Sequence, residues 1–440
     1  MINKKYLDSI KNILGEEYKD FIRALDKPPF RGLFVNTLKA DKEKFLNVFP
    51  YELKPTPFAE NGYYIESREP MGTNPLHHAG AFYMQEPSAM SVVAAADIQE
   101  NEKVLDLCAA PGGKSINAAC ALKSTGLLWS NEINKSRASI LLSNIERMGI
   151  KNAVVSSCSP EQLAEQLPGF FDKVIVDAPC SGEGMLRREK ADYDDWSEEN
   201  IYLCADRQEK ILNCAARLVR PGGTITYSTC TFNTTENEKS VSNFLSLHSD
   251  FSPQNTPVKG TRSGVGMPFA SRIFPMDGGE GHFVANMKKS ESGDVVKYKA
   301  FTPSKIPPEL KSFWEQTMNT ALPENLIVIG NKVFCPPKDF PQTGLKGIIR
   351  AGVFLGEVGK NRFIPSHNLF TAFNKDEFKN RISFDIDDEK LKRYLHGEEI
   401  AAEGVSGYTV VCVEGISLGG GKASCSKLKN HYPKGLRNLK

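Results

Sequence analysis

Several features of other protein classes are missing from this sequence of 440 residues. No apolar run is long enough to cross a bilayer, and the start, MINKKYLDSIKNILGEEYKDF, lacks the apolar centre of a signal peptide. None of the ten cysteines forms a C-x-x-C pair, which argues against a zinc site of the usual spacing. We therefore expect a cytoplasmic monomer with reduced cysteines, no metal and no membrane contact.

Strong net charge, internal repeats and low-complexity tracts are also lacking. The formal charge is +2, so any polyanionic partner must be held by local basic patches. Hydrophobic residues make up 40% and charged residues 25%, as in ordinary globular proteins, and the length predicts two to four domains. From the changes in pattern we expect a series of five segments: 1–95, 96–288, a polar linker at 289–300, 301–375 and 376–440.

From about residue 100 the sequence alternates buried-strand runs with helical segments. The strands are expected at 103–108, 126–132, 152–157, 171–177 and 224–230. This alternation predicts a parallel, doubly wound α/β sheet. The segment 134–150 is an amphipathic helix that Gly149 ends, and its expected common face consists of Ile140, Leu141, Asn144, Ile145 and Met148. In such sheets ligands bind beyond the carboxyl ends of the strands, so we expect functional residues in the loops there.

The first of these loops is DLCAAPGGKS, from Asp106 to Ser115. Its end resembles a phosphate-binding loop, but that motif needs glycine at the position of Cys108, and the dinucleotide pattern G-x-G-x-x-G is absent as well. The loop is instead a tight turn that a ligand can approach closely. Glu132 lies 19 residues after Gly113, near the separation at which an acid meets a ribose. The pair suits S-adenosylmethionine, although Glu132 could also be a surface residue at a strand end.

Two cysteines follow neighbouring strands of the predicted sheet. Cys180 lies in DAPCSG after the fourth strand, and Cys230 lies in STCT after the fifth. Because parallel neighbours end at the same edge, both thiols are expected at one rim of the sheet. Taken singly, a cysteine is more often a small core residue than a catalytic one. These two, however, lie just past strand ends among small polar residues, where the core does not need them.

These motifs carry a resemblance to a known family. VLDLCAAPGGKS, VDAPCSGEGMLRR and YSTCTFNTTENE resemble the cofactor, Pro-Cys and Thr-Cys loops of the RNA (cytosine-C5)-methyltransferases, and AGAFYMQEPSAM resembles the segment that precedes their catalytic domain. The ending GGGKASCSKLKNHYPKGLR resembles the PUA-like module of the bacterial ribosomal-RNA branch. The resemblance covers essentially the whole chain. It implies an α/β fold with a Rossmann-like class I methyltransferase sheet, an N-terminal α/β extension and C-terminal α+β RNA-binding modules, including a PUA-like domain.

The resemblance also implies roles for individual residues. Cys230 would attack C6 of a cytosine and Cys180 would act in product release. Residue chemistry alone leaves the reverse order open, because DNA cytosine methyltransferases use a Pro-Cys cysteine as nucleophile. Asp177 would face the N3/N4 edge of the flipped base, its alternative role being a strand-end acid that caps a turn. The implied S-adenosylmethionine contacts are Cys108, Ala109, Ala110, Pro111, Gly112, Gly113, Lys114, Glu132, Ser159 and Asp177.

The expected partner is RNA, in the first place small-subunit ribosomal RNA or the 30S subunit. Residues 421–440 contain six Lys or Arg and no acid. The candidate phosphate contacts are Arg187, Arg188, Lys427, Lys429, Lys434 and Arg437. A transfer RNA substrate and a non-catalytic RNA-binding assembly factor remain alternatives, whereas the Thr-Cys loop and the PUA-like end disfavour a DNA methyltransferase.

Two positions depart from the family pattern. The third strand ends in Ser157-Cys158-Ser159, where an acid or amide usually helps to seat the adenine. Gly420 stands where the C-terminal signature usually carries tryptophan, so a stacking or packing surface would be lost there.

Overall fold

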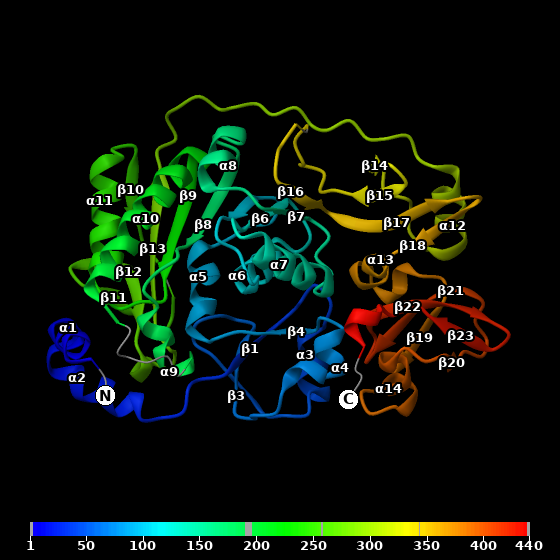
Figure 1. Ribbon diagram of the computed structural model, residues 1–440, viewed down its shortest axis with the longest axis horizontal. Helices are drawn as coiled ribbons and strands as arrows, with labels where there is room; N and C mark the ends of the chain where they lie inside the picture. Colours follow the sequence, from blue (N-terminus) through cyan, green and yellow to red (C-terminus); the bar gives the residue numbers. More distant parts are fainter. Residues whose placement is uncertain (1–2, 190–195, 257, 343, 438–440) are drawn as a thin grey trace.

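The computed structural model describes residues 3–189, 196–256, 258–342 and 344–437. A large mixed sheet occupies its centre, in the order β11-β12-β13-β9-β8-β5-β6-β7-β16, with β10 beside β13 (Figure 1). The central strands are parallel to one another, which confirms the predicted doubly wound region. They are β9 (Val219–Thr229), β8 (Phe171–Asp177), β5 (Lys103–Asp106), β6 (Leu127–Asn131) and β7 (Ala153–Ser156).

Alternate residues of the central strands face two separate hydrophobic cores. Leu105 packs with the helices of one face and its neighbour Val104 with those of the other. The first face is covered by α8 (Pro160–Gln166), α10 (Glu198–Leu218) and α11 (Ser240–Leu247). The second is covered by α5 (Ser91–Ala96), α6 (Gly113–Leu122) and α7 (Lys135–Arg147). Both faces are therefore buried, which explains why these strands read as continuous apolar runs.

The predicted apolar face of α7 was wrong at one position. Leu141 and Ile145 are buried, and Gly149 follows the helix with φ 67°, as expected for a helix stop. Ile140, however, is 54% exposed. It lies about 100° around the helix from Leu141, outside the stripe that also contains Ala138.

The sheet is not parallel throughout, which corrects the sequence-based expectation. At one end, β13 (His282–Lys289) runs antiparallel to β9 and is followed by β12 (Met267–Ile273) and β11 (Arg262–Gly264), with β10 (Phe251–Gln254) pairing to β13. At the other end, β16 (Ile348–Ala351) from the C-terminal part pairs antiparallel with β7. It thereby covers what would otherwise be an open strand edge.

Smaller sheets flank the central one. The N-terminal part has α1 (Lys4–Leu14), α2 (Tyr18–Leu25), α3 (Lys42–Val48), α4 (Pro75–His78) and an antiparallel sheet of β2 (Leu53–Pro55), β3 (Gly62–Ile65), β1 (Gly32–Val35) and β4 (Phe82–Met84). The C-terminal part has α12 (Pro308–Thr317), α13 (His367–Ala372), α14 (Glu389–His396) and two sheets. One contains β14 (Ile327–Ile329), β15 (Lys332–Cys335), β17 (Val353–Gly359) and β18 (Arg362–Pro365), and the other contains β19 (Arg381–Phe384), β21 (Gly407–Val413), β22 (Ile416–Ser424), β23 (Lys427–Asn430) and β20 (Ile400–Ala401).

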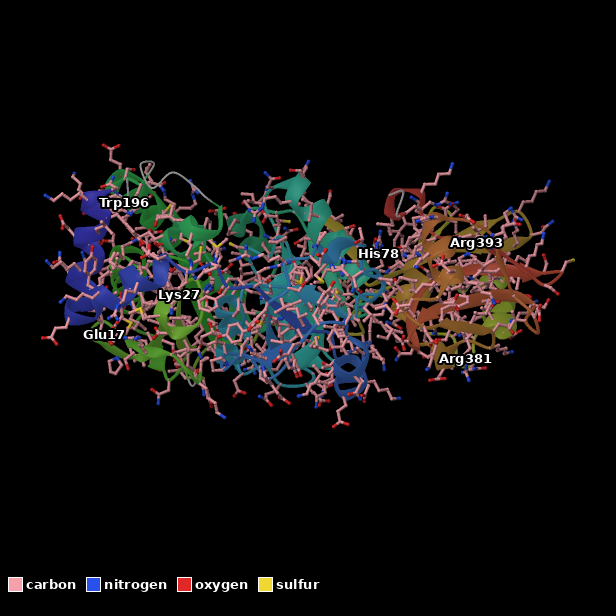
Figure 2. The ribbon with its side chains drawn as sticks, turned by 90° about the horizontal axis from the view of Figure 1, so that it is seen from below. Glu17, Lys27, His78, Trp196, Arg381 and Arg393 are labelled. Atoms are coloured by element: carbon pink, nitrogen blue, oxygen red, sulfur yellow. The ribbon has the colours of Figure 1, made fainter. Side chains whose placement is uncertain are left out.

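The N-terminal sheet packs against the last sheet of the C-terminal part. One hydrophobic cluster contains residues of both the N-terminal sheet and the last sheet. Lys39 Nζ donates to the Ser417 carbonyl at 2.8 Å, and His78 Nδ1 lies 2.9 Å from the Tyr432 hydroxyl. Figure 2 shows His78 at the junction between these parts, and Figure 1 shows the chain after β13 crossing the molecule on its way to α12. The N-terminal sheet is thus held between the central sheet and the C-terminal part.

Within the described residues, no helix is long and apolar enough to span a membrane. The same residues contain no cluster of three or more His, Cys, Asp or Glu side chains that could hold a metal ion.

Candidate functional site

A cavity of about 360 Å³ lies at the carboxyl edge of the central strands. Its wall joins the loop after β5 to the ends of β8 and β9, to the start of β13 and to the segment that follows β4. The predicted site residues that line it are Cys108, Ala109, Ala110, Pro111, Gly113, Lys114, Asp177 and Cys230. The topology therefore brings most of the predicted cofactor and catalytic residues to one place.

The loop after β5 turns tightly into α6. Gly112 has φ 120°, and a Cβ atom there would lie 3.2 Å from the Leu141 side chain, so glycine suits this turn. Beneath the loop, the Ser115 hydroxyl donates to Asp106 Oδ2 at 2.7 Å. Burial raises the pKa of Asp106 to about 7, and its Oδ1 has no hydrogen-bond partner within the described part of the chain. The loop thus rests on a buried carboxyl group with one unsatisfied oxygen.

Asp177 forms an ion pair across the cavity wall. Its Oδ2 lies 2.8 Å from Lys114 Nζ, and its Oδ1 accepts a hydrogen bond from the Ser228 hydroxyl at 2.8 Å. Burial alone would raise the pKa of Asp177, but the Lys114 ammonium and His282 together lower it below its usual value. Asp177 is therefore a carboxylate and a hydrogen-bond acceptor, not a proton donor.

His282 is a cavity residue that sequence reasoning missed. It begins β13, its Nδ1 lies 3.0 Å from the Gly281 carbonyl, and its Nε2 lies 3.6 Å from Asp177 Oδ1. This buried Nε2 makes no hydrogen bond to any described residue. No sequence signal could have identified His282. It reaches the cavity because β13 is added antiparallel to β9, with Phe283 opposite Thr229, and this pairing is not part of the alternating strand–helix pattern.

The two predicted thiols lie in contact. Cys180 Sγ and Cys230 Sγ are 3.3 Å apart, and both residues are free cysteines. The hydrogen bond to Cys230, followed by burial, raises the pKa of Cys180 well above its usual value. Cys180 is therefore held as a thiol, in hydrogen-bond contact with the sulfur of Cys230.

Three predicted cofactor residues do not line this cavity: Gly112, which is buried within the turn itself, Ser159 and Glu132. Ser159 is the N-cap of α8, where its hydroxyl accepts from Gln162 N, and its backbone N–H is bonded by the Gln162 side chain. Glu132 is buried at the end of β6, where it accepts from Asn134 N at 2.9 Å and lies 3.3 Å from Arg137. Residues 157–159, which depart from the family pattern, contact the C-terminal part. Ser157 N and Cys158 Sγ donate hydrogen bonds to backbone carbonyls of the segment that leads into β16.

Five of the six predicted RNA contacts fall into three groups. Lys427, Lys429 and Lys434 are exposed on the last sheet and the turn after it. The Arg437 guanidinium bonds the Tyr432 carbonyl at 3.3–3.4 Å, so it is partly engaged. The Arg188 side chain lies outside the described residues.

Arg187 is the clear correction among the predicted RNA contacts. Its guanidinium forms two hydrogen bonds with Glu280, at 2.6 and 2.8 Å, and a third to the Ala24 carbonyl. Both side chains of the ion pair are almost fully buried, at 8% and 1% exposure. Arg187 thus joins the N-terminal helices to the segment before β13, and each of its three guanidinium nitrogens is hydrogen-bonded within the protein.

Gly420 is packed against an aromatic ring from another element. A Cβ atom at this position would lie 2.4 Å from Phe370 on α13, and the Gly420 carbonyl accepts from the Tyr394 hydroxyl at 3.0 Å. The space of a larger side chain is therefore filled by Phe370, which retains an aromatic surface in the core although residue 420 has none.

The sheet, the glycine-rich turn at its carboxyl edge and the cavity define a methyltransferase of the Rossmann-like class. Comparison with family models matches residues 93–288 to 16S rRNA methyltransferase RsmB/F and residues 2–87 to the N-terminal domain of RsmF. Residues 312–373 match the first C-terminal domain of RsmF, and residues 381–438 match its PUA domain.

Individual relatives match along nearly the whole chain. The ribosomal RNA small subunit methyltransferase F of Vibrio vulnificus is 32% identical over 98% of this chain and 96% of that protein. The enzyme of the same name from Klebsiella pneumoniae is 32% identical over 95% and 92%. A solved methyltransferase homologue from Pyrococcus horikoshii is 27% identical and superimposes with a TM-score of 0.58, covering 65% of this chain and 95% of that one. The chain belongs to the RsmF family of 16S rRNA methyltransferases.

Proposed function

We propose that this protein transfers a methyl group from S-adenosylmethionine to C5 of a cytosine in 16S ribosomal RNA, through a covalent bond between Cys230 and C6. The observation that carries the proposal is the contact of 3.3 Å between the sulfurs of Cys180 and Cys230, beside a cavity that holds the Lys114–Asp177 ion pair. Family membership supports methylation of ribosomal RNA, and the pair of thiols supports cytosine C5 as the target.

The cavity residues fit S-adenosylmethionine. The tight turn at Gly112 places Gly113 in the cavity wall, and beneath the loop lies Asp106 Oδ1, which has no hydrogen-bond partner among the described residues. The wall also contains a cation, Lys114, and the residues Ala109 and Pro111. Glu132, at the end of the next strand, remains our candidate for the ribose hydroxyls. The cofactor supplies a methyl group bonded to a positively charged sulfur, and the cysteines and Asp177 act on the cytosine.

Cys230 activates the ring. C5 of cytosine is a poor nucleophile, so a thiolate must first add to C6. The S–C6 bond forms while the C5=C6 electron pair moves toward N3. As N3 gains electron density it takes up a proton from water, and it gives this proton back once the methyl group is bound. Asp177, a carboxylate, accepts hydrogen bonds from the N4 amino group and from this transient N3–H, and so stabilises the activated ring. Lys114 holds Asp177 in the charged form that this role requires.

Release reverses the addition. After methyl transfer, the proton on C5 passes to a base, the C–H pair restores the C5=C6 bond, and the C6–S bond breaks to return the Cys230 thiolate. We assign this proton to Nε2 of His282, which lines the cavity and lies 3.6 Å from Asp177 Oδ1. Cys180, held as a thiol beside Cys230, donates its hydrogen bond to the departing sulfur. In this scheme Cys230 is the nucleophile and Cys180 assists release.

We also propose how the RNA is held. A cytosine in structured RNA must be turned out of its stack to reach Cys230. Residues 1–95 and 376–440 would choose the RNA, with Lys427, Lys429 and Lys434 as exposed phosphate contacts, and 96–288 would carry the chemistry. A monomer acting in the cytoplasm, where the small subunit is assembled, suits these roles.

The test is a denaturing gel of protein expressed with cellular RNA, comparing wild type, Cys180→Ala and Cys230→Ala. We expect a slowly migrating, ribonuclease-sensitive adduct in Cys180→Ala alone, because that variant attacks but does not release. Sequencing the trapped RNA distinguishes 16S ribosomal RNA from transfer RNA. An adduct only in Cys230→Ala would reverse the two roles, and no adduct together with no binding of S-adenosylmethionine would point to an assembly factor without catalysis.

A further inference from the structure

Two buried carboxylates connect the loops that carry the thiols, and they do so in opposite directions. We call residues 178–185 the Pro-Cys loop and residues 230–239 the Thr-Cys loop. Glu183 belongs to the Pro-Cys loop and accepts hydrogen bonds from the Thr-Cys loop. Glu236 belongs to the Thr-Cys loop and accepts hydrogen bonds from the Pro-Cys loop. None of the chemistry described above uses either carboxylate.

Glu236 is fully buried and holds the residue next to Cys180. Its Oε2 accepts from Ser181 N at 3.0 Å, and its Oε1 accepts from the Ser181 hydroxyl. The Gln208 side chain donates to Oε2 at 2.8 Å and also to the Pro179 carbonyl at 3.0 Å, so both neighbours of Cys180 are held. Asn233 Nδ2 supplies a further bond to Oε1 at 2.8 Å. Four donors on two oxygens match a carboxylate, which accepts without donating.

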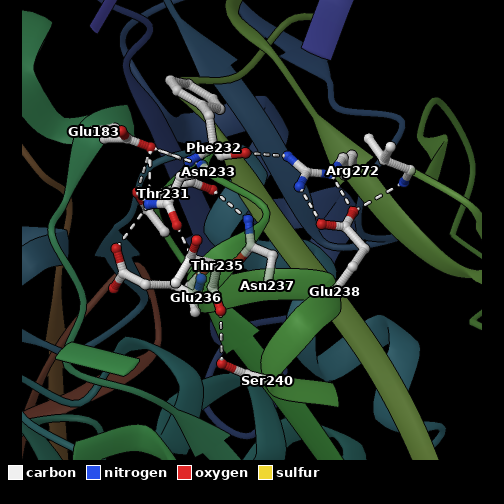
Figure 3. Close-up of polar contacts among 12 residues, drawn as sticks. Glu183, Thr231, Phe232, Asn233, Thr235, Glu236, Asn237, Glu238, Ser240 and Arg272 are labelled. Carbon is white, nitrogen blue, oxygen red and sulfur yellow. Dashed lines mark hydrogen bonds and ion pairs between the residues drawn. The ribbon is translucent and has the colours of Figure 1, made fainter. Parts of the chain in front are cut away.

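Glu183 makes the reciprocal connection. Its Oε2 accepts from the Thr231 hydroxyl at 2.6 Å, from Phe232 N at 2.7 Å and from Asn233 N at 2.8 Å. The three residues directly after Cys230 are therefore bonded to one oxygen of the opposite loop, as Figure 3 shows. The other oxygen accepts from Trp196 Nε1 at 2.8 Å.

The backbone of both loops is shaped for this contact. Gly184 N donates to the Cys230 carbonyl at 2.8 Å, and a Cβ atom at Gly184 would lie 2.9 Å from that same oxygen. Residues Thr235–Lys239 form a π-helix, a rare conformation that is frequent at functional sites and here contains Glu236. Glu238, on the same π-helix, is bonded instead to Arg272 at 2.6 Å and not to the Pro-Cys loop.

We propose that Glu236 and Glu183 are positioning residues that hold the two sulfurs at contact distance, and that their effect falls on release of the RNA more than on attack. The inference rests on the proposed function. Attack needs Cys230, Asp177 and the cytosine, whereas release also needs Cys180 to reach the departing sulfur. A loop displaced by a fraction of an ångström would therefore leave the adduct able to form but slow to resolve.

Glu236→Gln is the sharpest variant. An amide at this position brings its own N–H₂ group against donors of Ser181, Asn233 or Gln208, so the Pro-Cys loop must shift. Glu209→Gln is the matched control, because Glu209 is exposed on α10 directly beside Gln208 and touches neither loop. Both variants remove one negative charge from the same region.

The measurements are the fraction of protein covalently bound to RNA at steady state, the multiple-turnover rate, and the rate of adduct formation in a single turnover. We expect Glu236→Gln to raise the bound fraction at least tenfold and to lower turnover by a similar factor, while adduct formation slows less than threefold. Glu209→Gln should match wild type in all three. A purely structural role would lower the amount of folded protein without changing how the remaining molecules divide between attack and release.

The results distinguish failure of the positioning role from failure of the proposed function. If adduct formation and release slow equally in Glu236→Gln, or if no adduct accumulates, the positioning role is wrong. If wild type forms no 5-methylcytosine, the proposed function itself fails, whatever the variant does. Should Glu236→Gln not fold, Ser181→Ala and Gln208→Met weaken the same link without a change in charge. In either of these variants an unaltered bound fraction would equally overturn the inference.

Discussion

The sulfur of Cys180 lies 3.3 Å from the sulfur of Cys230, although 50 residues separate them in the chain. The contact follows from parallel pairing of β8 with β9, in which Asp177 stands opposite Ser228. Each strand ends within three residues of its cysteine, so the two thiols emerge side by side. The proximity that the chemistry needs is thus a property of strand register.

Asp177→Asn tests the charged form of the cavity acid. The substitution removes the partner of Lys114 and the carboxylate that accepts from the N4 amino group and the transient N3–H of the activated ring. We expect kcat/KM for methylation to fall about 10²- to 10³-fold, the range seen when one preorganised electrostatic contact is lost. Because the pKa of Asp177 is lowered, wild-type activity should show no titration of this group between pH 5 and 8. A pH profile of both proteins checks this, with circular dichroism as the control for folding.

His282→Gln tests the acceptor for the C5 proton. Loss of a general base costs about 10² to 10⁴ in rate. We expect methylation turnover to fall by at least 10², and the base in the trapped adduct to carry the methyl group on C5 together with the C5 proton, since methyl transfer precedes proton removal. Mass spectrometry of the base in the adduct decides the matter, and an unmethylated trapped base would assign His282 to an earlier step.

Arg187→Ala separates a structural arginine from an RNA contact. It leaves Glu280 buried without its partner, which should cost about 3–5 kcal/mol in the free energy of unfolding. The salt dependence of RNA binding should stay unchanged. Lys427→Ala/Lys429→Ala is the contrasting variant, because both side chains are exposed: its stability should be that of wild type, while the slope of log K against log salt should become shallower by about 1.4. An interchange of these two phenotypes would contradict the assignment.

Gly420→Trp tests the packing of the last sheet. The new side chain would enter the volume of Phe370, so we expect a loss of about 1–3 kcal/mol from overpacking. Phe370→Ala in the same protein should recover part of that loss, whereas Phe370→Ala alone should be destabilising. Thermal unfolding of the four proteins gives the coupling energy, and additive effects would show that the two positions do not share space.

Lys39→Met tests the contact between the N-terminal sheet and the last sheet. Burial lowers the pKa of Lys39 to about 7 in the folded protein, while the unfolded chain keeps it protonated to about 10.4. Between these values the unfolded state binds more protons, so stability relative to Lys39→Met should rise with pH by up to about 1.4 kcal/mol per unit. Below pH 7 the difference should become constant. Denaturant unfolding of both proteins at pH 6, 7, 8 and 9 measures it, and a flat difference above pH 7 would show that Lys39 is solvated.

Much of the site could be predicted because its residues lie in short, local patterns. The strands from 103 to 177 are buried on both faces, which leaves apolar runs, and the loops after them carry Pro111, Cys180 and Cys230 in distinctive surroundings. Parallel pairing of successive strands is also a general rule, so the meeting of the two thiols followed from the order of elements. Residues on strands that do not follow this rule, such as the antiparallel strand β13, could not be predicted.

Local sequence determined the strand–turn–helix units, the glycine stop of α7 and the presence of two thiols and an acid at strand ends, since each depends on neighbours within a few residues. Only the tertiary structure decided that His282 enters the cavity and that Arg187 forms a buried ion pair with Glu280. It also decided that Phe370 fills the space beside Gly420, and that Glu183 and Glu236 each bond to the opposite loop. These partners are separated by between about 50 and 100 residues, and their contacts exist only once packing of the sheets and buried hydrogen bonding select one arrangement of the chain.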